Sequence, residues 1–370
     1  MNPNIYHFAH TEYAQDAFIS WLCACYNQND NEYKRDISKK FIREMLGVSI
    51  SFSTVSIKNQ YLNIDILLTL ESENERYFVI IEDKKFSKYH GRQLEKYIDS
   101  LIKAERTSAD KIFVVYYKTG HISKTPNWIY FKDKKFFYDT SITSELDTVN
   151  AVKDRFPSLR KLTICDLSQI NSFFMSADIQ NLIMNSGSEI LNDYSCNIHE
   201  LYKALYETKC LPARIEHAEQ QEIWGKVFDD FIYDNAASFE ELSFKLDLYS
   251  GVYWEIYITQ RLKSSDGECN FPNQPILNVR ADIFKRKRKQ MVYFFLVPES
   301  SSLIDATRKE VKQNKCSYSY IIEWEKLKNE TLRELRLSDD YVNIENFKLF
   351  LSAICEEFKN SMSENRQFEL

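Results

Sequence analysis

Two carboxylates and a lysine stand out in the first third of this 370-residue chain because they interrupt or directly follow apolar runs. Asp65 lies between two isoleucines in a run that has the alternation of a β-strand. Glu82 and Lys84 follow the apolar run at 78–81, and the two-residue period of a strand places their side chains on one face. If the two runs pair as an antiparallel hairpin, these three side chains converge at one point of a sheet.

Such a cluster has the composition of a site that cleaves phosphodiester bonds. Carboxylate oxygens are hard ligands that suit Mg²⁺ or Mn²⁺, and Mg²⁺ usually binds through one or two carboxylates together with a substrate phosphate. A bound ion can polarise the phosphate, acidify a water molecule and stabilise the leaving oxygen. Lys84 could orient that water, take its proton if the lysine pKa is lowered, or stabilise developing charge.

Each candidate residue also has a purely structural interpretation. The charges at 82–85 could belong to a strand that leaves the core for water, where charges cost little. Glu12 could be a first-turn acid that the helix dipole favours, while Gln93 and Tyr97 could be a packing pair one helical turn apart. Asp65 is the hardest to explain structurally, because an unpaired carboxylate in a buried strand is costly unless it is paired or metal-bound.

The elements that would position these residues can be predicted from hydrophobic periodicity. Helices are expected at 11–26, 34–46 and 92–105, and strands at 48–57, 61–70, 77–86 and 111–117. This order predicts an α/β (α+β) fold with a mixed sheet flanked by helices. A polar and aromatic insertion rich in lysine is expected at 118–146.

The small residues at 185–188 (Asn-Ser-Gly-Ser) give the best domain boundary in the chain. We therefore expect one domain at 1–185 and a C-terminal α+β domain at 190–370, with a role in substrate choice or oligomerisation. In the second domain, helices are expected near 198–209, 213–234, 302–313 and 344–359, and strands at 242–248, 252–259, 276–284, 291–297 and 318–323.

At the residues described above, the chain resembles the PD-(D/E)XK nuclease superfamily, whose fold is restriction-endonuclease-like. It is most similar to bacterial members that carry Ile-Glu-Asn-Lys followed by Gln-Leu-x-x-Tyr. Here the corresponding residues are Ile-Glu-Asp-Lys at 81–84 and Gln-Leu-x-x-Tyr at 93–97. Such members begin with a helix that has a glutamate ahead of an aromatic and Trp-Leu run, as in Glu12 and 18–22. The resemblance covers roughly residues 8–120.

The resemblance implies that Asp65 and Glu82 bind a divalent metal and that Lys84 serves the attacking water. Glu12 would support a metal through water, and Gln93 would line the site from its helix. The implied activity is that of a metal-dependent phosphodiesterase, an endonuclease more than an exonuclease, with a role in microbial genome defence. DNA is favoured over RNA as its substrate, although the sequence does not distinguish the two. The alternative is a catalytically silent nuclease-fold protein that binds nucleic acid or another protein.

Two positions depart from the pattern of the superfamily. Ile64 occupies the position of the proline that gives the superfamily its name, which leaves the following acid in place. Asp83 creates a rival triplet, Asp83-x-Lys85, on the opposite strand face. We favour Glu82 and Lys84 because the motif places its glutamate directly after the isoleucine.

The net charge of −6 argues against a protein that coats nucleic acid, but not against an enzyme with a local basic cleft. Two basic groups could contact phosphates: Lys88, His90 and Arg92, and the run of Lys285, Arg286 and Lys287 that continues to residue 289. The second run could equally be a solvated hairpin tip.

Other features narrow the class of protein. No two of the seven glycines lie closer than 16 residues apart, which excludes the glycine-rich loops of nucleotide-binding folds. No apolar run is long enough to suggest a membrane span, and no secretory signal is visible. Eight scattered cysteines predict free thiols in a reducing cytoplasm rather than a disulfide framework. We also expect that the chain can form a homodimer.

Overall fold

The structure of the protein is a computed structural model. It describes residues 4–7, 11–48, 51–72, 75–87, 89, 92–125, 129–132, 135–138, 144–212, 218–235, 237–238, 242–249, 253–260, 269–270, 276–282, 291–297, 336–338, 341–345, 347–349, 351–352, 355–356 and 359. In this part of the chain, no helix has the length and apolar character that a membrane crossing requires. The chain forms two units: unit 1 holds Met1–Ile122 and Glu145–Glu207, and unit 2 holds Ser123–Ser144 and Thr208–Leu370.

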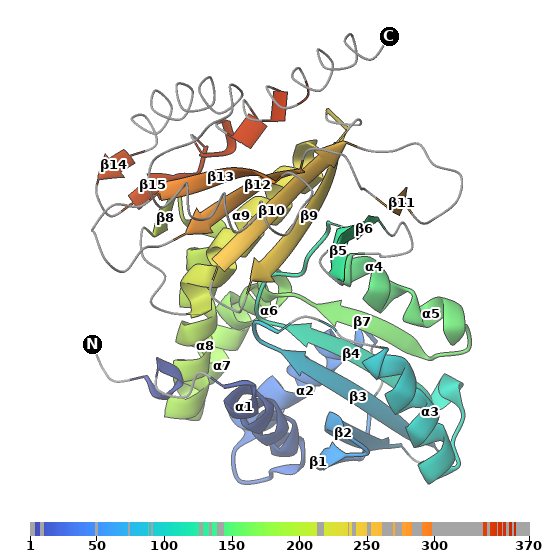
Figure 1. Cartoon of the computed structure of the whole chain (residues 1–370). Coiled ribbons are helices and arrows are strands. Elements are labelled where there is room, and N and C mark those ends of the chain that lie inside the picture. The colour runs from blue at the N-terminus through green and yellow to red at the C-terminus, as the bar shows by residue number, and fades with distance from the viewer. Residues whose placement is uncertain are drawn as a thin grey trace, which may run out of the picture. The chain divides into compact units, whose positions relative to one another are not determined.

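Unit 1 is built on a five-stranded mixed sheet, drawn in Figure 1. Its strands, in spatial order, are β1 (Thr54–Tyr61), β2 (Ile64–Glu71), β3 (Arg76–Lys84), β4 (Ile112–Lys118) and β7 (Lys161–Cys165). The first three strands pair antiparallel, while β4 runs parallel to both β3 and β7. The sequence prediction of a mixed sheet flanked by helices is confirmed.

Helix α3 (Gln93–Glu105) covers one face of this sheet and connects β3 to β4. Its apolar stripe, which includes Leu94, Ile98 and Leu101, shares a buried cluster with Ile80 of β3 and Val114 of β4. The apolar face of the helix, with its period of 3.6 residues, thus packs on the apolar face of the strands, with their period of two. This packing fixes α3 beside the end of β3, where the candidate site residues lie.

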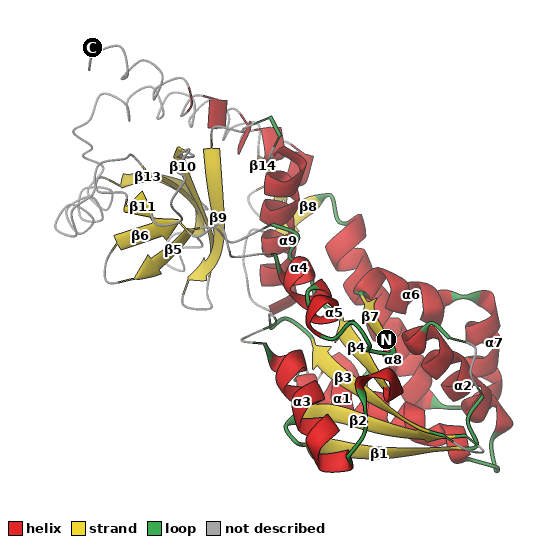
Figure 2. Cartoon of the chain, turned by 90° about the vertical axis from the view of Figure 1, so that its right-hand side faces the viewer, coloured by secondary structure: helices red, strands yellow, loops and turns green. Residues whose placement is uncertain are grey.

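The opposite face of the sheet is covered by helices whose aromatic side chains pack together. These helices are α1 (Glu12–Ala24), α2 (Glu32–Leu46), α6 (Leu167–Met175), α7 (Ala177–Ser186) and α8 (Glu189–Tyr202). Phe18 of α1 stacks on Tyr194 of α8, with ring centroids 3.6 Å apart, and the hydroxyls of Tyr194 and Tyr117 lie 3.0 Å apart. Figure 2 shows α2, α6, α7 and α8 gathered beside the strands.

Local capping explains where several of these helices begin and end. The side chain of Asn31 accepts the N–H of Lys34 at the start of α2, which ends where Gly47 adopts a left-handed conformation (φ 56°). Two short helices, α4 (Glu145–Asn150) and α5 (Val152–Arg155), precede β7. The first predicted helix is shorter than expected, because α1 ends at Ala24 and a 3-10 turn follows at Cys25–Asn27.

The first strand is displaced from its prediction. The sequence indicated strands at 48–57 and 61–70, whereas β1 extends to Tyr61 and pairs there with Ile64 of β2. The chain reverses at Leu62 and Asn63, which both have positive φ. No glycine or proline marks this turn, and Asn63 is its one residue of a type that commonly adopts positive φ, so the sequence signal of a hairpin was weak.

The expected domain boundary at 185–188 lies within unit 1 in the structure. Gly187 is left-handed (φ 63°) and ends α7, and Ser188 accepts the N–H of Leu191 to begin α8. The Ser-Gly patch therefore marks a tight turn between two packed helices, because a C-cap glycine and a linker glycine look alike in sequence. The structure divides later, at 207–208, and assigns 123–144 to unit 2.

Unit 2 contains α9 (Ala218–Asn235) and a four-stranded antiparallel sheet in the order β13-β12-β10-β9. These strands are β9 (Leu242–Tyr249), β10 (Tyr253–Gln260), β12 (Ile276–Asp282) and β13 (Met291–Val297), close to four of the predicted strands. Two smaller sheets are formed by β5 (Ile129–Lys132), β6 (Lys135–Tyr138) and β11 (Cys269–Asn270), and by β8 (Cys210–Pro212), β14 (Arg336–Ser338) and β15 (Tyr341–Asn343). The helix and strand expected at 302–323 lie outside the described residues.

A buried aspartate organises the start of unit 2. Asp229 of α9 has no exposed surface and accepts hydrogen bonds from the backbone N–H groups of Lys124 and Thr125 at 2.9 and 3.0 Å. The hydroxyl of Ser123 donates to the same carboxylate at 2.9 Å. Because a buried charge is stable only when it is well solvated by donors, this carboxylate fixes 123–125 against α9.

Candidate active site

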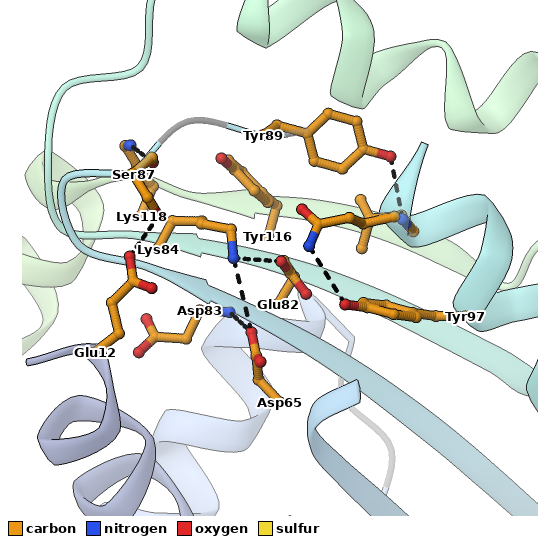
Figure 3. Close-up of polar contacts among 12 residues, drawn as sticks. Glu12, Asp65, Glu82, Asp83, Lys84, Ser87, Tyr89, Tyr97, Tyr116 and Lys118 are labelled. Carbon is orange, nitrogen blue, oxygen red and sulfur yellow. Dashed lines mark hydrogen bonds and ion pairs between the residues drawn. The ribbon is translucent and has the colours of Figure 1, made fainter. Parts of the chain in front are cut away.

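The structure brings Asp65, Glu82 and Lys84 together at one point of the unit 1 sheet, as Figure 3 shows. The strands β2 and β3 pair antiparallel, with Ile66 opposite Ile81, so the neighbouring positions carry Asp65 and Glu82. The Lys84 Nζ atom lies 2.5 Å from Glu82 Oε1 and 4.0 Å from Asp65 Oδ2. The convergence that the hairpin hypothesis required is present.

The Asp65 carboxylate has hydrogen-bond donors that its position between two isoleucines did not suggest. Its Oδ2 atom accepts the backbone N–H of Asp83 at 3.2 Å, and its Oδ1 atom accepts the side-chain amide of Gln60 at 3.3 Å. The side chain is 20% exposed, so it faces the rim of the site rather than the apolar core. These donors and this exposure let a carboxylate stand between two isoleucines without a metal.

Glu82 has no exposed surface, and burial raises its pKa to about 7, with the nearby charge of Asp65 adding to the effect. The ammonium of Lys84 pairs with Oε1 of Glu82, whereas Oε2 has no donor from the protein. Buried polar atoms without a donor are uncommon and call for an explanation. Two adjacent carboxylates, one of which has an oxygen without a donor, fit a divalent cation.

Lys84 is held as a cation in this arrangement. Burial alone would lower its pKa, but the charges of Glu82 and Asp65 raise it above the ordinary lysine value. The ammonium therefore neutralises part of the negative charge between the two acids. With a raised pKa, Lys84 is suited to orient a water molecule or to stabilise charge, and it is a poor proton acceptor.

Asp83, the acid of the rival triplet, points to the other side of β3. Its Oδ1 atom accepts the side-chain amide of Gln15 at 2.5 Å, and Gln15 in turn accepts the Thr119 hydroxyl at 2.9 Å. Burial, followed by the charge of Asp16, raises the pKa of Asp83 well above its usual range. Asp83 therefore lies beneath α1, on the face that does not carry Glu82.

The first helix contributes two acids to this region. Glu12 accepts the backbone N–H of Lys85 at 3.0 Å and the hydroxyl of Ser87 at 2.5 Å, which ties the start of α1 to the end of β3. Asp16, one turn later, is buried, and its pKa is raised to about 6 by burial and by Asp65. The sequence prediction missed Asp16, although its spacing of four from Glu12 places both on one helix face.

Helix α3 borders the site with Gln93 and Tyr97. The amide of Gln93 is 3.5 Å from the Tyr97 hydroxyl, and burial followed by the charges of Glu82 and Asp65 raises the pKa of Tyr97 to about 12. Of the expected phosphate contacts, Arg92 precedes this helix in a left-handed conformation (φ 60°). The others lie outside the described residues: Lys88, His90, Lys285, Arg286 and Lys287.

The segment after β3 is anchored by a buried ion pair that the sequence prediction missed. Lys118, the last residue of β4, donates to the carbonyl of Ser87 at 2.5 Å and lies 3.6 Å from Glu145. The Glu145 carboxylate also accepts the Tyr116 hydroxyl at 2.5 Å and the backbone N–H of Tyr89 at 3.2 Å. A lysine at the end of a wholly apolar strand was the available signal, because its burial requires a partner.

Tyr89 continues this support to the start of α3. Its hydroxyl donates to Glu95 at 2.6 Å and accepts the N–H of Leu94 at 3.1 Å. A tyrosine oxygen thus satisfies one of the first N–H groups of the helix, which have no partner within the helix itself. The positions of Gln93 and Tyr97 beside Glu82 depend on this contact.

Among the described residues, no group of three or more histidine, cysteine, aspartate or glutamate side chains is arranged to hold a metal ion. The site offers two carboxylates, Asp65 and Glu82. This number is sufficient for Mg²⁺, which commonly keeps several waters and takes further ligands from substrate phosphates.

Residues 1–146 match the family model of the PD-(D/E)XK nuclease superfamily. No curated protein and no solved structure matches the chain. The matched region includes β1 to β4, α1, α3 and every residue of the candidate site described above, and nucleases of this superfamily generally use divalent metals.

Proposed function

Because residues 1–146 match the family model of the PD-(D/E)XK nuclease superfamily, we propose that the protein is a nuclease that depends on Mg²⁺ or Mn²⁺ and hydrolyses phosphodiester bonds. One observation carries the proposal. Glu82 is buried with its Oε2 atom lacking a donor from the protein, beside a second acid, Asp65, and a lysine that pairs with Oε1. This combination costs stability in a protein that has no use for it.

In the proposed mechanism, Asp65 and Glu82 would hold the cation. When bound, the ion would supply Lewis-acid activation of the phosphate and of a water molecule. Glu82 must be deprotonated to act as a ligand, and its pKa of about 7 makes metal affinity dependent on pH near neutrality. Glu12 holds the end of β3 through Lys85 and Ser87, and it would support the metal through a water molecule.

Lys84 and Gln93 act on the water and the substrate. With its raised pKa, Lys84 orients the attacking water and stabilises charge that develops on the phosphate, and it does not abstract a proton. Gln93 lines the site from α3, next to Tyr97. The water oxygen bonds to phosphorus while the bond from phosphorus to the leaving sugar oxygen breaks. The proton of the water passes to solvent or to a phosphate oxygen, and the leaving oxygen takes a proton from solvent.

The proposed substrate is DNA, cut internally, as in a genome-defence nuclease. Because the net charge is −6, affinity for phosphates must come from local basic groups. We assign this role to Lys88, His90 and Arg92, which follow Lys84 closely in the sequence, and to Lys285, Arg286 and Lys287 of unit 2. Unit 2 would select the substrate or form a homodimer, and the free thiols of six described cysteines suit a cytoplasmic protein.

A cleavage assay tests the proposal. Purified protein is incubated with single- and double-stranded DNA and RNA in Mg²⁺ or Mn²⁺, with EDTA as the reference. Cleavage of closed circular DNA indicates an endonuclease. Asp65→Ala should reduce cleavage to the EDTA background while the circular dichroism spectrum is retained. Glu71→Gln is the matched control, because Glu71 is an exposed acid at the far end of the same strand.

The alternative function is that of a nuclease-fold protein that binds nucleic acid without cleaving it. Retention of both acids and the lysine argues against it, because a site without catalysis has no need of a buried, raised-pKa glutamate. Tight binding of DNA with no cleavage in either metal, unaffected by Asp65→Ala, would favour this alternative over a nuclease.

A further inference from the structure

The hairpin that joins β1 and β2 contains three left-handed residues and no glycine. Leu62 (φ 57°) and Asn63 (φ 63°) form the two-residue turn between the paired residues Tyr61 and Ile64. Two-residue turns of type I′ have positive φ at both central positions, so these two conformations are explained by the hairpin itself. Gln60 (φ 53°) lies outside the turn, and its conformation needs another reason.

Gln60 occupies the position opposite Asp65. The β1–β2 ladder pairs Asn59 with Ile66 and Tyr61 with Ile64, and the position between these pairs joins Gln60 to Asp65. This pair is absent from the ladder, where the backbone of Gln60 turns into the left-handed region. Its side-chain amide reaches Asp65 Oδ1 at 3.3 Å. The backbone of Gln60 therefore departs from regular strand geometry at the residue whose side chain contacts Asp65.

The two oxygens of Asp65 receive donors from opposite sides. Gln60 on β1 donates to Oδ1, and the backbone N–H of Asp83 on β3 donates to Oδ2. Two donors from different strands fix the rotation of a carboxylate that one donor would leave free. The held carboxylate keeps Oδ2 at 4.0 Å from the Lys84 ammonium.

We propose that Gln60 is a positioning residue that orients Asp65 as a ligand for a divalent cation; this inference rests on the proposed function. A neutral amide suits the role, because it donates a hydrogen bond without competing with the cation for the acid, as an ammonium would. Substitution of a residue that hydrogen-bonds to a metal-ligating carboxylate typically lowers metal affinity or activity by about ten- to a hundredfold. Strained backbone is typically retained at sites where it serves such a function.

The experiment measures Mn²⁺ affinity by calorimetry, and cleavage where the wild type cleaves, for Gln60→Ala, Gln60→Gly and Asn63→Gly in the full chain. Both Gln60 variants should weaken Mn²⁺ binding about tenfold or more. Gln60→Gly should also raise the midpoint of thermal unfolding above that of Gln60→Ala, because glycine accepts positive φ. Asn63→Gly is the matched control. Asn63 is an exposed left-handed residue of the same hairpin, but it is not part of the candidate site.

A role confined to folding would change the unfolding midpoint alone, so affinity and kcat/KM equal to wild type in Gln60→Ala would overturn the proposal. Equal losses in Asn63→Gly would also overturn it, because they would point to the hairpin rather than the amide. If the wild type binds Mn²⁺ through Asp65 but cleaves nothing, the proposed nuclease function fails while Mn²⁺ affinity still decides the role of Gln60. Failure of the wild type to bind Mn²⁺ would reject the role of Gln60.

Discussion

The ammonium of Lys118 lies 3.6 Å from the carboxylate of Glu145, and the two side chains are 0% and 4% exposed. This buried ion pair joins the end of β4 to the first turn of α4. Through Ser87 and Tyr89 it also fixes the segment that leaves β3 after Lys84. The candidate site is thus held in place by residues that do not belong to it.

Glu145→Ala should strongly destabilise unit 1. The variant would leave the Lys118 ammonium buried without its ion-pair partner, and breaking a buried pair in this way costs about 3–5 kcal/mol. The free energy of unfolding, measured by urea denaturation, checks the prediction. Asp99→Ala is the control, because the Asp99–Arg155 pair at 2.9 Å is exposed and such pairs contribute about 0–1 kcal/mol. Equal effects of the two substitutions would show that the buried pair has no special weight.

Lys84→Ala should lower kcat of the cleavage reaction by about a hundredfold or more, as expected for removal of a group that stabilises transition-state charge. Lys85→Ala should have little effect, because the contact of Lys85 with Glu12 is made by its backbone N–H and survives the substitution. Steady-state kinetics on a DNA substrate measures both. The reverse order of effects would mean that Asp83 and Lys85 form the catalytic face.

Stability without metal should fall as the pH rises from about 4.5 to 7. The pKa of Glu82 is raised from 4.5 to about 7 in the folded protein, so the folded state binds the proton more tightly than the unfolded state. Its contribution is fully present below pH 4.5 and is lost through pH 7, at up to about 3 kcal/mol. Asp16, with a pKa of about 6, acts in the same direction.

Urea denaturation at pH 5 and pH 8 in EDTA measures this effect. Glu82→Gln should reduce the difference between the two pH values, because a neutral side chain has no proton to lose. Glu71→Gln, at an exposed position, should leave the difference unchanged. A wild type that is more stable at pH 8 than at pH 5 in EDTA would contradict the raised pKa of Glu82.

Binding of DNA should weaken steeply as salt rises, because each phosphate neutralised by a lysine or arginine releases counterions. About three to five such contacts on a duplex give a log–log slope of roughly −3 to −5. Replacement of the five basic residues 285–289 by alanine should flatten the slope if unit 2 contacts DNA, without changing Mn²⁺ affinity. An unchanged slope would identify this run as a solvated loop and favour a role of unit 2 in dimerisation.

The sequence by itself determined the local features of the candidate site. Strand periodicity placed Glu82 and Lys84 on one face and Asp83 on the other, because side-chain direction along a strand depends only on parity. Given this parity, Asp65 converges with Glu82 and Lys84 if the two strands pair as an antiparallel hairpin. The pairing of Ile66 with Ile81 shows that they do. The mixed sheet and its flanking helices followed from periodicity in the same way.

Only the tertiary structure decided which distant residues support the site. Lys118 and Glu145 are 27 positions apart, and Asp16 is 49 positions from Asp65, so no short-range pattern relates them. Their proximity results from the packing of helices on opposite faces of one sheet. The left-handed Gln60 was hidden for a related reason, because its conformation depends on a cross-strand partner and not on its own residue type.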